Sequence, residues 1–531
     1  MAKHNKEYYG SFLVRRNMDK VKNLVRYNLA GVMLLFLGGC SIVGPDFSIP
    51  EAPVAETWRE RGKANEQTTI SMAEEETAHK EWWRVFNDEV LNSLIKKAYE
   101  GNLTLRVAGL RVLEARARLG FAEGMLYPQQ QALTADASTN GLSKNDTVYG
   151  PEMDRYYPRA SIGFEAGWEI DFWGKFRRAI QSTDAALNAE VASYDDMLVA
   201  LTAEVARAYI TIRTFNERIR IGEENIKIQK QSLHIATINF KNGNTTELDA
   251  QQAKSLLYNT EAAIPEYRLG LHQAQHGLSV LLGLPPQSLA VLLQGTTAIP
   301  TAPASIAVGL PADLLRRRPD IQKAEFIASA KCANVGVAES ALYPHISLVG
   351  SMGFSSIDSG DKELNDLFNS DSIGFTFGPA MRWDIFNYGR LKNQIRTQDA
   401  VFEQAITEYQ NTVLNAAREV EDNMAAFLFT TERARSLNQS VTASKRAANI
   451  SRIQYREGLV DYQRVLDTDR YLAGQEDSYI IAKGDIALHL IGLYKALGGG
   501  WQMRLGNDFV PQDIQEKMSS RTDWGQLIDR N

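Results

Sequence analysis

The chain has 531 residues and a formal net charge of −6, with 58 Lys and Arg against 64 Asp and Glu. This balance lacks the basic surplus of a nucleic-acid-binding protein, so no nucleic acid is expected as a partner. Two cysteines, far apart in the sequence, exclude a disulfide framework. The absence of any run of about 18 apolar residues argues against a membrane-spanning α-helix.

Residues 1–39 have the pattern of a signal segment that directs a protein across a membrane. Five basic residues between positions 15 and 26 precede the apolar run Leu29–Leu37, and two glycines separate this run from Cys40. A cysteine in this place resembles the lipobox of bacterial lipoproteins, which implies cleavage before Cys40 and a covalent lipid on it. A cysteine that merely ends an ordinary signal is the alternative. Met1 and Met18 are both possible starts, because the segment from Met18 onward is a complete short signal.

Residues 40–80 are predicted to form an extended N-terminal arm, since three prolines are followed by a polar run with little periodicity. A helical pattern begins at Glu81 and continues to Leu126. The dipeptide Tyr127-Pro128 ends it, because proline cannot continue a helix.

After this proline the period of the sequence changes from that of a helix to that of a strand. In Ser161–Ile170 every second residue is apolar and the residues between are small or acidic, and Ile373–Trp383 repeats the alternation. A weaker alternating run precedes each, so β-hairpins are predicted at about 129–172 and 345–386. About ten residues are enough for a tilted membrane strand. A soluble sheet with one wet face is the alternative.

The two sets of alternating positions are assigned to opposite faces of a membrane barrel. The side chains expected to face lipid are Phe164, Trp168, Phe375 and Trp383, and those expected to face the lumen or a neighbouring subunit are Glu165, Glu169 and Arg382.

The next stretch is predicted to form one very long helix, Lys175–Lys241, between Gly174 and Gly243. It contains no proline, and its apolar residues recur at alternating steps of four and three. Such a heptad pattern has a period of about 3.5 residues and is typical of a left-handed coiled coil. About 67 residues rising 1.5 Å each make a rod of roughly 100 Å.

The sequence contains an internal two-fold repeat. The segment Trp168–Lys175 recurs as Trp383–Arg390, and the same spacing of 215 positions carries Gly243 onto Gly458. A fixed spacing of this kind signals a duplicated unit. The predicted segments are a first repeat at 81–283, an equatorial linker at 284–312, a second repeat at 313–500 and a polar, loosely ordered C-terminal tail at 501–531.

Several pieces of the sequence together resemble one known family, the TolC-like outer membrane factors, and within it the lipoprotein branch typified by OprM. The matching pieces are the acylated start with Pro45, Ala52-Pro53-Val54, Trp82-Trp83 with Phe86, Trp168–Asp171 with Gly174, Leu314–Ile321, Tyr455–Gly458 and Lys495–Trp501. They extend over residues 40–501, and their combination is specific, whereas single pieces would be weak.

The resemblance implies a mainly α fold with β strands, assembled as a homotrimer. Each chain would give four strands to one twelve-stranded β-barrel in the outer membrane of a Gram-negative bacterium, and its coiled-coil helices would form an α-helical barrel across the periplasm. The implied function is a passive efflux duct. A periplasmic adaptor would open it, an inner-membrane pump of the RND type would drive it, and no cofactor beyond the lipid on Cys40 is implied.

Elementary physics supports part of this assembly independently. Four strands cannot close a barrel, and an open sheet edge is not tolerated in lipid. Several chains must therefore share one barrel. Strand number alone allows two, three or four chains, so the trimer rests on the family resemblance.

The resemblance also assigns roles to the two turns that join the long helices. The turns at Gly243-Asn244 and Gly458-Leu459 match the tips on which the family docks its adaptor. Glycine also suits such a turn for purely structural reasons, because it adopts positive φ. Both roles remain open at these positions.

The same resemblance places a periplasmic gate just above the tips. The family has an aspartate nine residues after the second tip glycine, and Asp467 stands there. In the best-known member a tyrosine of the second hairpin ties the tip shut by bonding to an aspartate of the first, and Tyr455 and Asp249 match these two. Solvated charges at a helix end are the alternative reading.

This chain departs from that member at two gate positions. Val460 replaces a latch arginine, and Arg464 replaces a second aspartate. The closing contacts must therefore differ in part, and Arg464 is expected to pair with Asp467 or Asp461.

No catalytic or metal-binding constellation accompanies these features. His272 and His276 lie one helical turn apart but lack a third ligand, so a solvated helix face is the preferred interpretation. Cys332 stands in a helical context and is interpreted as a packing residue. Gly174-Lys175 lacks the pattern of a phosphate-binding loop. We therefore predict that the protein is not an enzyme.

Other functions remain possible from the sequence. A structural coiled-coil envelope lipoprotein would not need the two alternating hairpins, and a surface-anchored hydrolase would need catalytic residues. A duct for type I protein secretion is a further alternative, because the sequence does not reveal whether drugs, metal ions, lipids or proteins pass.

Overall fold

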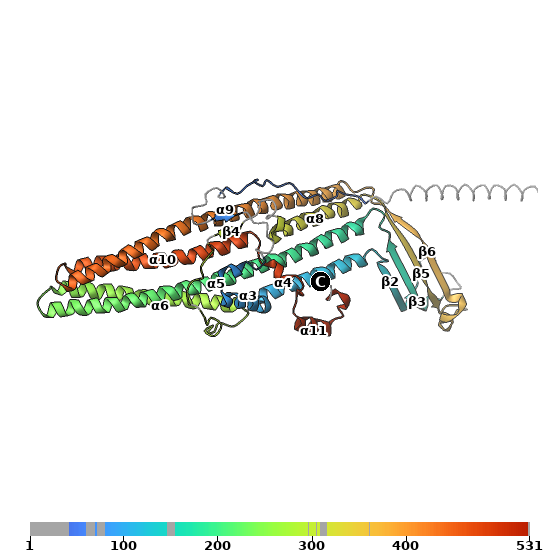
Figure 1. The fold of residues 1–531 in the computed structure, drawn as a ribbon. Helices are drawn as coiled ribbons and strands as arrows, with labels where there is room; N and C mark the ends of the chain where they lie inside the picture. The colour runs from blue at the N-terminus through green and yellow to red at the C-terminus, as the bar shows by residue number, and fades with distance from the viewer. Residues whose placement is uncertain are drawn as a thin grey trace, which may run out of the picture. The chain divides into compact units, whose positions relative to one another are not determined.

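The computed structural model describes residues 42–59, 69–71, 80–145, 154–295, 297–303, 305–307, 316–360 and 362–528 (Figure 1). The signal segment 1–39 and Cys40 lie outside these residues. The chain divides into two compact units. Unit 1 comprises Met1–Ser48, Arg118–Ala185 and Ser329–Gln404, and unit 2 comprises Ile49–Ala117, Ala186–Ala328 and Ala405–Asn531. Both repeats therefore contribute to each unit.

Unit 1 contains one antiparallel sheet in the order β2-β3-β5-β6. The strands are β2 (Gln130–Gly141), β3 (Tyr156–Glu169), β5 (His345–Ile357) and β6 (Ile373–Arg382). Both predicted hairpins are confirmed, and they join through β3 and β5, so one sheet combines the two repeats (Figure 1). Within the described residues, β2 and β6 each have one edge that pairs with no strand.

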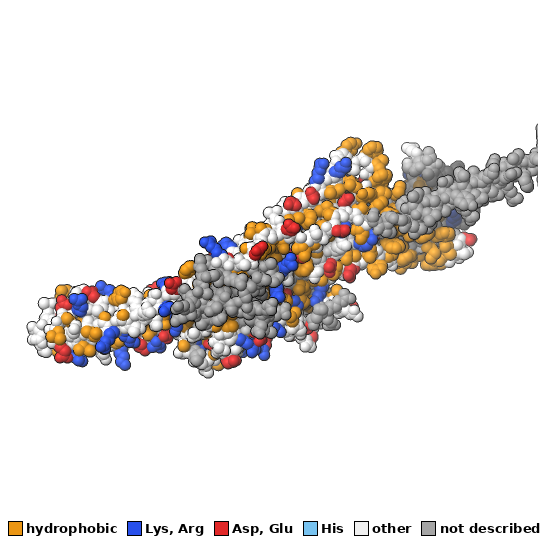
Figure 2. Space-filling view, turned by 45° about the horizontal axis from the view of Figure 1, so that its top comes forward, with side chains coloured by type: hydrophobic (Ala, Val, Ile, Leu, Met, Phe, Trp, Pro, Cys, Tyr) orange, Lys and Arg blue, Asp and Glu red, His pale blue; other side chains and the backbone are white. Residues whose placement is uncertain are grey.

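The register of the sheet separates apolar from polar side chains, as the alternation predicts. Leu133, Phe164, Met352 and Phe375 are direct cross-strand neighbours and form one row on the apolar face. On the opposite face the corresponding row is Ala132, Glu165, Ser351 and Thr376. The apolar row is exposed, with Phe375 at 79%. Figure 2 shows hydrophobic side chains gathered around the strands and charged side chains scattered along the long helices.

Two pairs of antiparallel helices follow the hairpins, one pair in each repeat. The first members are α5 (Lys175–Lys241) and α9 (Arg390–Arg456), with 67 residues each. The second members are α6 (Glu247–Leu281) and α10 (Tyr462–Ala496), with 35 residues each. The predicted bounds of α5 are confirmed, because the heptad pattern, the flanking glycines and the absence of proline all define the same segment. No helix in the described part of the chain is long and apolar enough to cross a membrane.

A large core of buried apolar side chains occupies unit 2. It receives residues from η2 (Trp82–Phe86), α3 (Glu89–Gly101) and α4 (Leu103–Gly124), together with parts of α5, α9 and α10. Trp82 is fully buried and stacks on Tyr494. Asp88 caps α3 by accepting the Val90 and Leu91 N–H groups, and it also accepts a hydrogen bond from the Tyr209 hydroxyl at 2.7 Å.

The described part of the C-terminal tail, residues 501–528, is ordered, so the prediction of a loose tail is wrong there. It forms η5 (Trp501–Arg504), α11 (Gln512–Arg521) and η6 (Gly525–Leu527). Phe509, Val510 and Met518 pack into the large core. Arg504 binds the carboxylate of Asp195 through two nitrogens. Met503, Ile514, Trp524 and Ile528 pack against the same core. The polar composition of the tail conceals these contacts.

The arm and the linker meet in a small sheet. Strand β1 (Thr69–Ser71) lies in the predicted arm, and strand β4 (Ser305–Ala307) lies in the predicted linker; the two pair in parallel. The remaining elements are α8 (Pro319–Ser340), which opens the second repeat, and two short helices in the β5–β6 loop, η3 (Leu364–Phe368) and η4 (Ser370–Ser372).

Candidate functional site

The chain reverses between α5 and α6 through a turn that Gly243 makes possible. The Gly243 N–H donates to the Phe240 carbonyl at 2.9 Å, and the Asn244 N–H donates to the Asn239 carbonyl at 2.9 Å. These two bonds are a Schellman motif, which satisfies carbonyls at the end of a helix. Gly243 has a φ of +73°, a left-handed conformation that costs glycine little.

The turn between α9 and α10 repeats the same motif. The Gly458 N–H donates to the Tyr455 carbonyl at 3.0 Å, and the Leu459 N–H donates to the Gln454 carbonyl at 2.8 Å. Gly458 also has a φ of +73°. The duplication therefore extends to the hydrogen bonds of the tips.

Both tips are open to solvent in this chain. Asn244 is exposed, and Leu459 exposes 73% of its surface. Among the described residues, no atom lies within 4 Å of the point where a Cβ on Gly243 or Gly458 would stand. Leu459 therefore contributes little to the packing of this chain.

Directly behind the turns, the four helices of unit 2 share a small cluster of buried side chains, the tip core. Its members are Ala236 from α5, Ala253 and Leu256 from α6, Tyr455 from α9, and Tyr462, Val465 and Leu466 from α10. The two tyrosine rings meet edge to face, with centroids 5.3 Å apart. Gln252 of α6 donates to Gln463 of α10 at 3.0 Å. The two hairpins of one chain are therefore packed together at the tips.

The predicted tie from Tyr455 to Asp249 is absent, which corrects the family-based expectation. Tyr455 is 5% exposed, and its hydroxyl makes no hydrogen bond with any described residue. The ring instead fills the tip core, and burial raises the pKa of Tyr455. Asp249 lies near another carboxylate: partial burial first, and then the charge of Asp461, raises the pKa of Asp249.

The expected pairing of Arg464 with an aspartate is also not formed by its side chain. Asp461 is the N-cap of α10, and its carboxylate accepts the backbone N–H of Arg464 at 3.2 Å. Asp467 accepts a hydrogen bond from Gln463 at 2.9 Å. Asp467 and Arg464 are both exposed and available to a neighbouring copy. An aspartate directly before a helix caps it by a local geometry that competes with any longer-range pair.

Sequence reasoning missed a buried acid close to the tip core. Asp469 is 6% exposed, and one of its carboxylate oxygens lies 3.5 Å from Arg452 Nε of α9. The other oxygen is buried and has no hydrogen-bond partner among the described residues. Burial raises the pKa of Asp469 to about 6. The sequence could have revealed it, because Asp469 and Glu476 both lie on the buried, mainly apolar face of α10.

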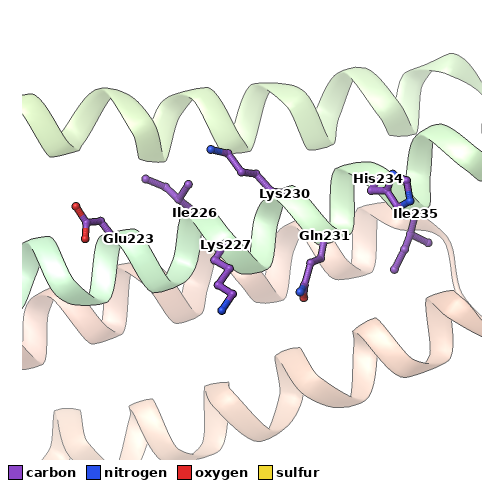
Figure 3. A pocket seen from close by; sticks show the side chains of 7 residues that line it. All are labelled: Glu223, Ile226, Lys227, Lys230, Gln231, His234 and Ile235. Carbon is purple, nitrogen blue, oxygen red and sulfur yellow. The ribbon is translucent and has the colours of Figure 1, made fainter.

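An open groove of about 760 Å³ runs along α5 on the tip side of unit 2. Its lining residues are Glu223, Ile226, Lys227, Lys230, Gln231, His234 and Ile235 (Figure 3). Figure 3 shows that these side chains leave α5 on two sides, with Lys230 on one and Lys227 on the other. Lys230 reaches Glu261 of α6 at 3.0 Å, so that side is held to the neighbouring helix. No motif in the sequence marks this groove.

In unit 1, residues 42–46 are held against the start of α5. Arg178 is 4% exposed, and its guanidinium donates to the carbonyls of Val43 and Gly44 and to the carboxylate of Asp46, each at 2.9 to 3.0 Å. The Val43 N–H donates to the Trp173 carbonyl at 3.1 Å. A Cβ on Gly44 would stand 2.3 Å from Gly336 Cα, so this segment lies directly against α8.

The described residues contain no group of three or more side chains placed to hold a metal ion. The rings of His272 and His276 are 6.2 Å apart, and no third ligand joins them. Cys332 is buried at 1% exposure and lies against the Pro45 carbonyl, so the interpretation as a packing residue is confirmed. Burial raises the pKa of the Cys332 thiol, which disfavours the nucleophilic thiolate.

Comparison with known proteins identifies relatives for nearly the whole chain. A family model described as outer membrane efflux protein matches residues 94–284 and 310–499, one match to each repeat. The toluene efflux pump outer membrane protein TtgC of Pseudomonas putida is 31% identical over 477 residues, which cover 90% of this chain and 96% of that protein. The cation efflux system protein CusC of Escherichia coli is 29% identical over 477 residues, which cover 88% of this chain and 97% of that protein.

Solved structures agree with these sequence relatives. The outer-membrane channel OprN superimposes with a TM-score of 0.79 at 31% identity, covering 87% of this chain and 99% of that chain. A structure of CusC, described in connection with transmembrane channel formation, superimposes with a TM-score of 0.71 at 26% identity, covering 86% of this chain and 100% of that chain.

Proposed function

The chain belongs to the outer membrane efflux protein family, and on this premise we propose that it is the outer-membrane duct of a tripartite efflux system. Small molecules pass through it passively from the cell, across the periplasm, to the exterior. An inner-membrane pump supplies the driving force, and a periplasmic adaptor opens the duct. The protein is not an enzyme.

One observation carries this proposal: a four-stranded sheet with an apolar face and two free edges continues directly into helices of 67 residues. Unpaired strand edges are not stable in hydrocarbon, so copies of the chain must close the sheet together. Three copies would give twelve strands, which is the homotrimer that the family resemblance implies. The apolar face with Phe164 and Phe375 would then contact lipid, and the face with Glu165 would line the lumen.

The tips are the proposed contact for the adaptor. Asn244 and Leu459 are exposed on turns that the tip core holds in a fixed shape. A crosslinker placed at Asn244 or Leu459 should capture an adaptor in whole cells. Capture only from the loops between strands would contradict this placement.

The proposed gate lies immediately behind the tips. Three copies would bring three Asp467 carboxylates together, and a ring of carboxylates favours cations. Asp467 and Arg464 are exposed in the single chain, so both can contact a neighbouring copy. Tyr455 closes the tip by packing in this proposal, in place of a bond to Asp249.

We also propose that Cys40 carries a covalent lipid. The support comes from the segment that follows, because Arg178 fixes residues 43–46 at the junction between strand β3 and helix α5. If the mature chain begins at Cys40, its N-terminus is close to this junction and can place acyl groups in the inner leaflet of the outer membrane. A single acyl chain anchors a protein only marginally, so several would be needed. Cys40→Ser should abolish incorporation of labelled fatty acid, and equal labelling would contradict the anchor.

The test of the function uses the purified full chain. In detergent gels the unboiled protein should migrate as a trimer and the boiled protein as a monomer. In planar bilayers the trimer should conduct ions. A protein that stays monomeric and does not conduct would favour the alternative, a structural envelope lipoprotein.

The cargo is open within this proposal, because relatives are named for toluene and for cations. Export of small molecules by an RND-type pump is distinguished from type I protein secretion by a gene deletion. Loss of the duct should raise sensitivity to solvents, drugs or metal ions. Loss of one secreted protein without such sensitivity would favour protein secretion.

A further inference from the structure

The apolar face of the sheet in unit 1 contains a hollow of about 320 Å³. Phe164, Met352, Phe354 and Ile373 line it from the strands, and Phe368 of η3 lines it from the β5–β6 loop. Phe368 meets Phe354 edge to face at 5.7 Å, so the loop forms a wall of the hollow. These aromatic and aliphatic groups offer no polar side-chain atom to a ligand.

The register of the strands locates the hollow. It lies between two rows of side chains, one through Phe164 and Met352 and the next through Ile162 and Phe354. The backbone between the rows is the paired Gly163 and Gly353. A Cβ on Gly353 would stand 2.5 Å from Gly163 Cα, so the two central strands approach closely there.

The hollow extends across all four strands, because Leu133 of β2 and Ile373 of β6 line it together with residues of β3 and β5. Copies of the chain must pair through the edges of β2 and β6. A copy that pairs in this way continues the sheet beside the hollow and does not lie over it. The surrounding side chains are well exposed, with Met352 at 63% and Phe368 at 70%.

We propose that this hollow binds one acyl chain of an outer-leaflet lipid. This inference rests on the proposed function, which immerses the apolar face in the membrane. The hollow reaches from the middle of β3 to Phe368 in the β5–β6 loop, at the end of the sheet remote from the start of α5. The proposed function directs that end towards the outer leaflet. A hollow of this size is about ten times the volume of one water molecule in the liquid, and water has no hydrogen-bond partner there. An empty hollow would lose dispersion contacts on every wall, and a hydrocarbon chain restores them.

The test uses the full-length protein in lipid nanodiscs that contain a phospholipid with a diazirine near the end of one acyl chain. After irradiation, mass spectrometry should locate adducts preferentially on Met352, Phe354 and Phe368. Phe377 is the internal reference, because it is 77% exposed in the same sheet and does not line the hollow. We expect several-fold more adducts in the hollow than at Phe377, and equal labelling would overturn the proposal.

Two variants make the result specific. Met352→Trp fills the hollow and should remove most of its adducts, whereas the matched Phe377→Trp should leave them unchanged. If Met352→Trp does not form a trimer, Phe368→Ala removes one wall and should reduce adducts on Phe354. Unchanged adducts in the variant that folds would overturn the proposal.

The remaining outcomes separate this inference from the proposed function. A conducting trimer whose adducts are spread evenly over the apolar face refutes the acyl site alone. Failure to enter nanodiscs or to conduct refutes the proposed function. Adducts that appear in dissociated monomers but not in the trimer would show that a second copy covers the hollow, which also overturns the acyl site.

Discussion

Two buried charges in the large-core region of unit 2, Asp195 and Arg318, each have more than one hydrogen bond, whereas the buried Asp469 near the tip core has one long contact. In the large-core region, Asp195 receives two hydrogen bonds from Arg504. Arg318 is 7% exposed and binds Asp320, Glu419 and the Ala496 carbonyl. Near the tip core, Asp469 has one contact at 3.5 Å, and its second oxygen has no partner among the described residues.

This difference suggests which part of the protein can move. A buried charge with several partners is costly to separate, because each partner would be left unpaired. A buried carboxylate with one long contact loses little when its helix shifts. We therefore expect the helices to open at the tips while the large core keeps its arrangement.

The largest expected change in the free energy of unfolding comes from Arg318, in the region of the large core. Arg318→Met keeps much of the side-chain volume but leaves Asp320 and Glu419 without their cation, so the free energy of unfolding should fall by about 3 kcal/mol. Urea unfolding followed by tryptophan fluorescence measures it. Arg220 is the matched control, since it also binds two carboxylates but its side chain is 49% exposed. Arg220→Met should cost less than about 1 kcal/mol, and equal losses would remove the distinction between buried and surface pairs.

The second prediction separates the ring of Tyr455 from its hydroxyl. Tyr455→Ala removes the ring from the tip core and should destabilise the tip by roughly 3 kcal/mol. The conductance of the isolated trimer in planar bilayers should rise. Tyr455→Phe should leave conductance unchanged, because the hydroxyl makes no hydrogen bond with any residue that the structure describes. If Tyr455→Phe also raised the conductance, the result would favour a hydrogen bond from the Tyr455 hydroxyl to Asp249 in the closed trimer.

The third prediction concerns pH at the tip. Burial raises the pKa of Asp469 to about 6, above its ordinary value of 3.8, so the packed state binds the proton more tightly than the open state. The packing of α9 on α10 should therefore weaken as pH rises from about 4 to about 6 and stay weak above that. Asp469→Asn should stabilise the tip by about 1 kcal/mol at pH 7.5.

Hydrogen exchange at the tip, corrected for the intrinsic rate at each pH, measures this effect. The wild-type tip should be better protected at pH 5 than at pH 7.5, and Asp469→Asn should remove the difference. Asp467→Asn is the control on the same helix, because Asp467 is exposed. A pH dependence that survives Asp469→Asn would assign it to another group, such as Asp249.

The smallest expected effect is on selectivity. Asp467→Ala should reduce the preference for cations in planar bilayers by a few-fold, since three carboxylates would leave the constriction. The stability of the single chain should not change, because among the described residues Asp467 is hydrogen-bonded only to Gln463 on its own helix. Unaltered selectivity would mean that the narrowest point lies elsewhere.

Helices and strands could be predicted from the sequence where a periodic pattern of apolar residues defines them. Helix α5 was predicted to the residue, and the sheet faces followed from strict alternation, because a period of two or 3.5 is visible in the chain itself. The order of the tail was missed, since Phe509 and Met518 are isolated apolar residues whose contacts are distant in sequence.

The side-chain contacts near the proposed gate could not be predicted from the sequence. A matching position in a family places Tyr455 and Asp249 near each other, but whether a hydroxyl and a carboxylate meet depends on shifts of about an ångström. Asp461 could have been recognised as the N-cap of α10, since aspartate directly before a helix is a common cap. The acid Asp469 could have been found by searching the apolar seam for charges.

The hydrogen bonds from Arg178 to residues 43–46 limit how far Cys40 can lie from the start of α5. Arg178 binds main-chain carbonyls at Val43 and Gly44, and Val43 is only three positions after Cys40 in the sequence. A fully extended chain of three residues spans about 11 Å. The lipid that we propose on Cys40 must therefore enter the bilayer within that short radius of the base of α5. Such a short link would fix the depth of the barrel in the membrane. Movement of the barrel along the membrane normal would pull the acyl chains away from their position in the leaflet.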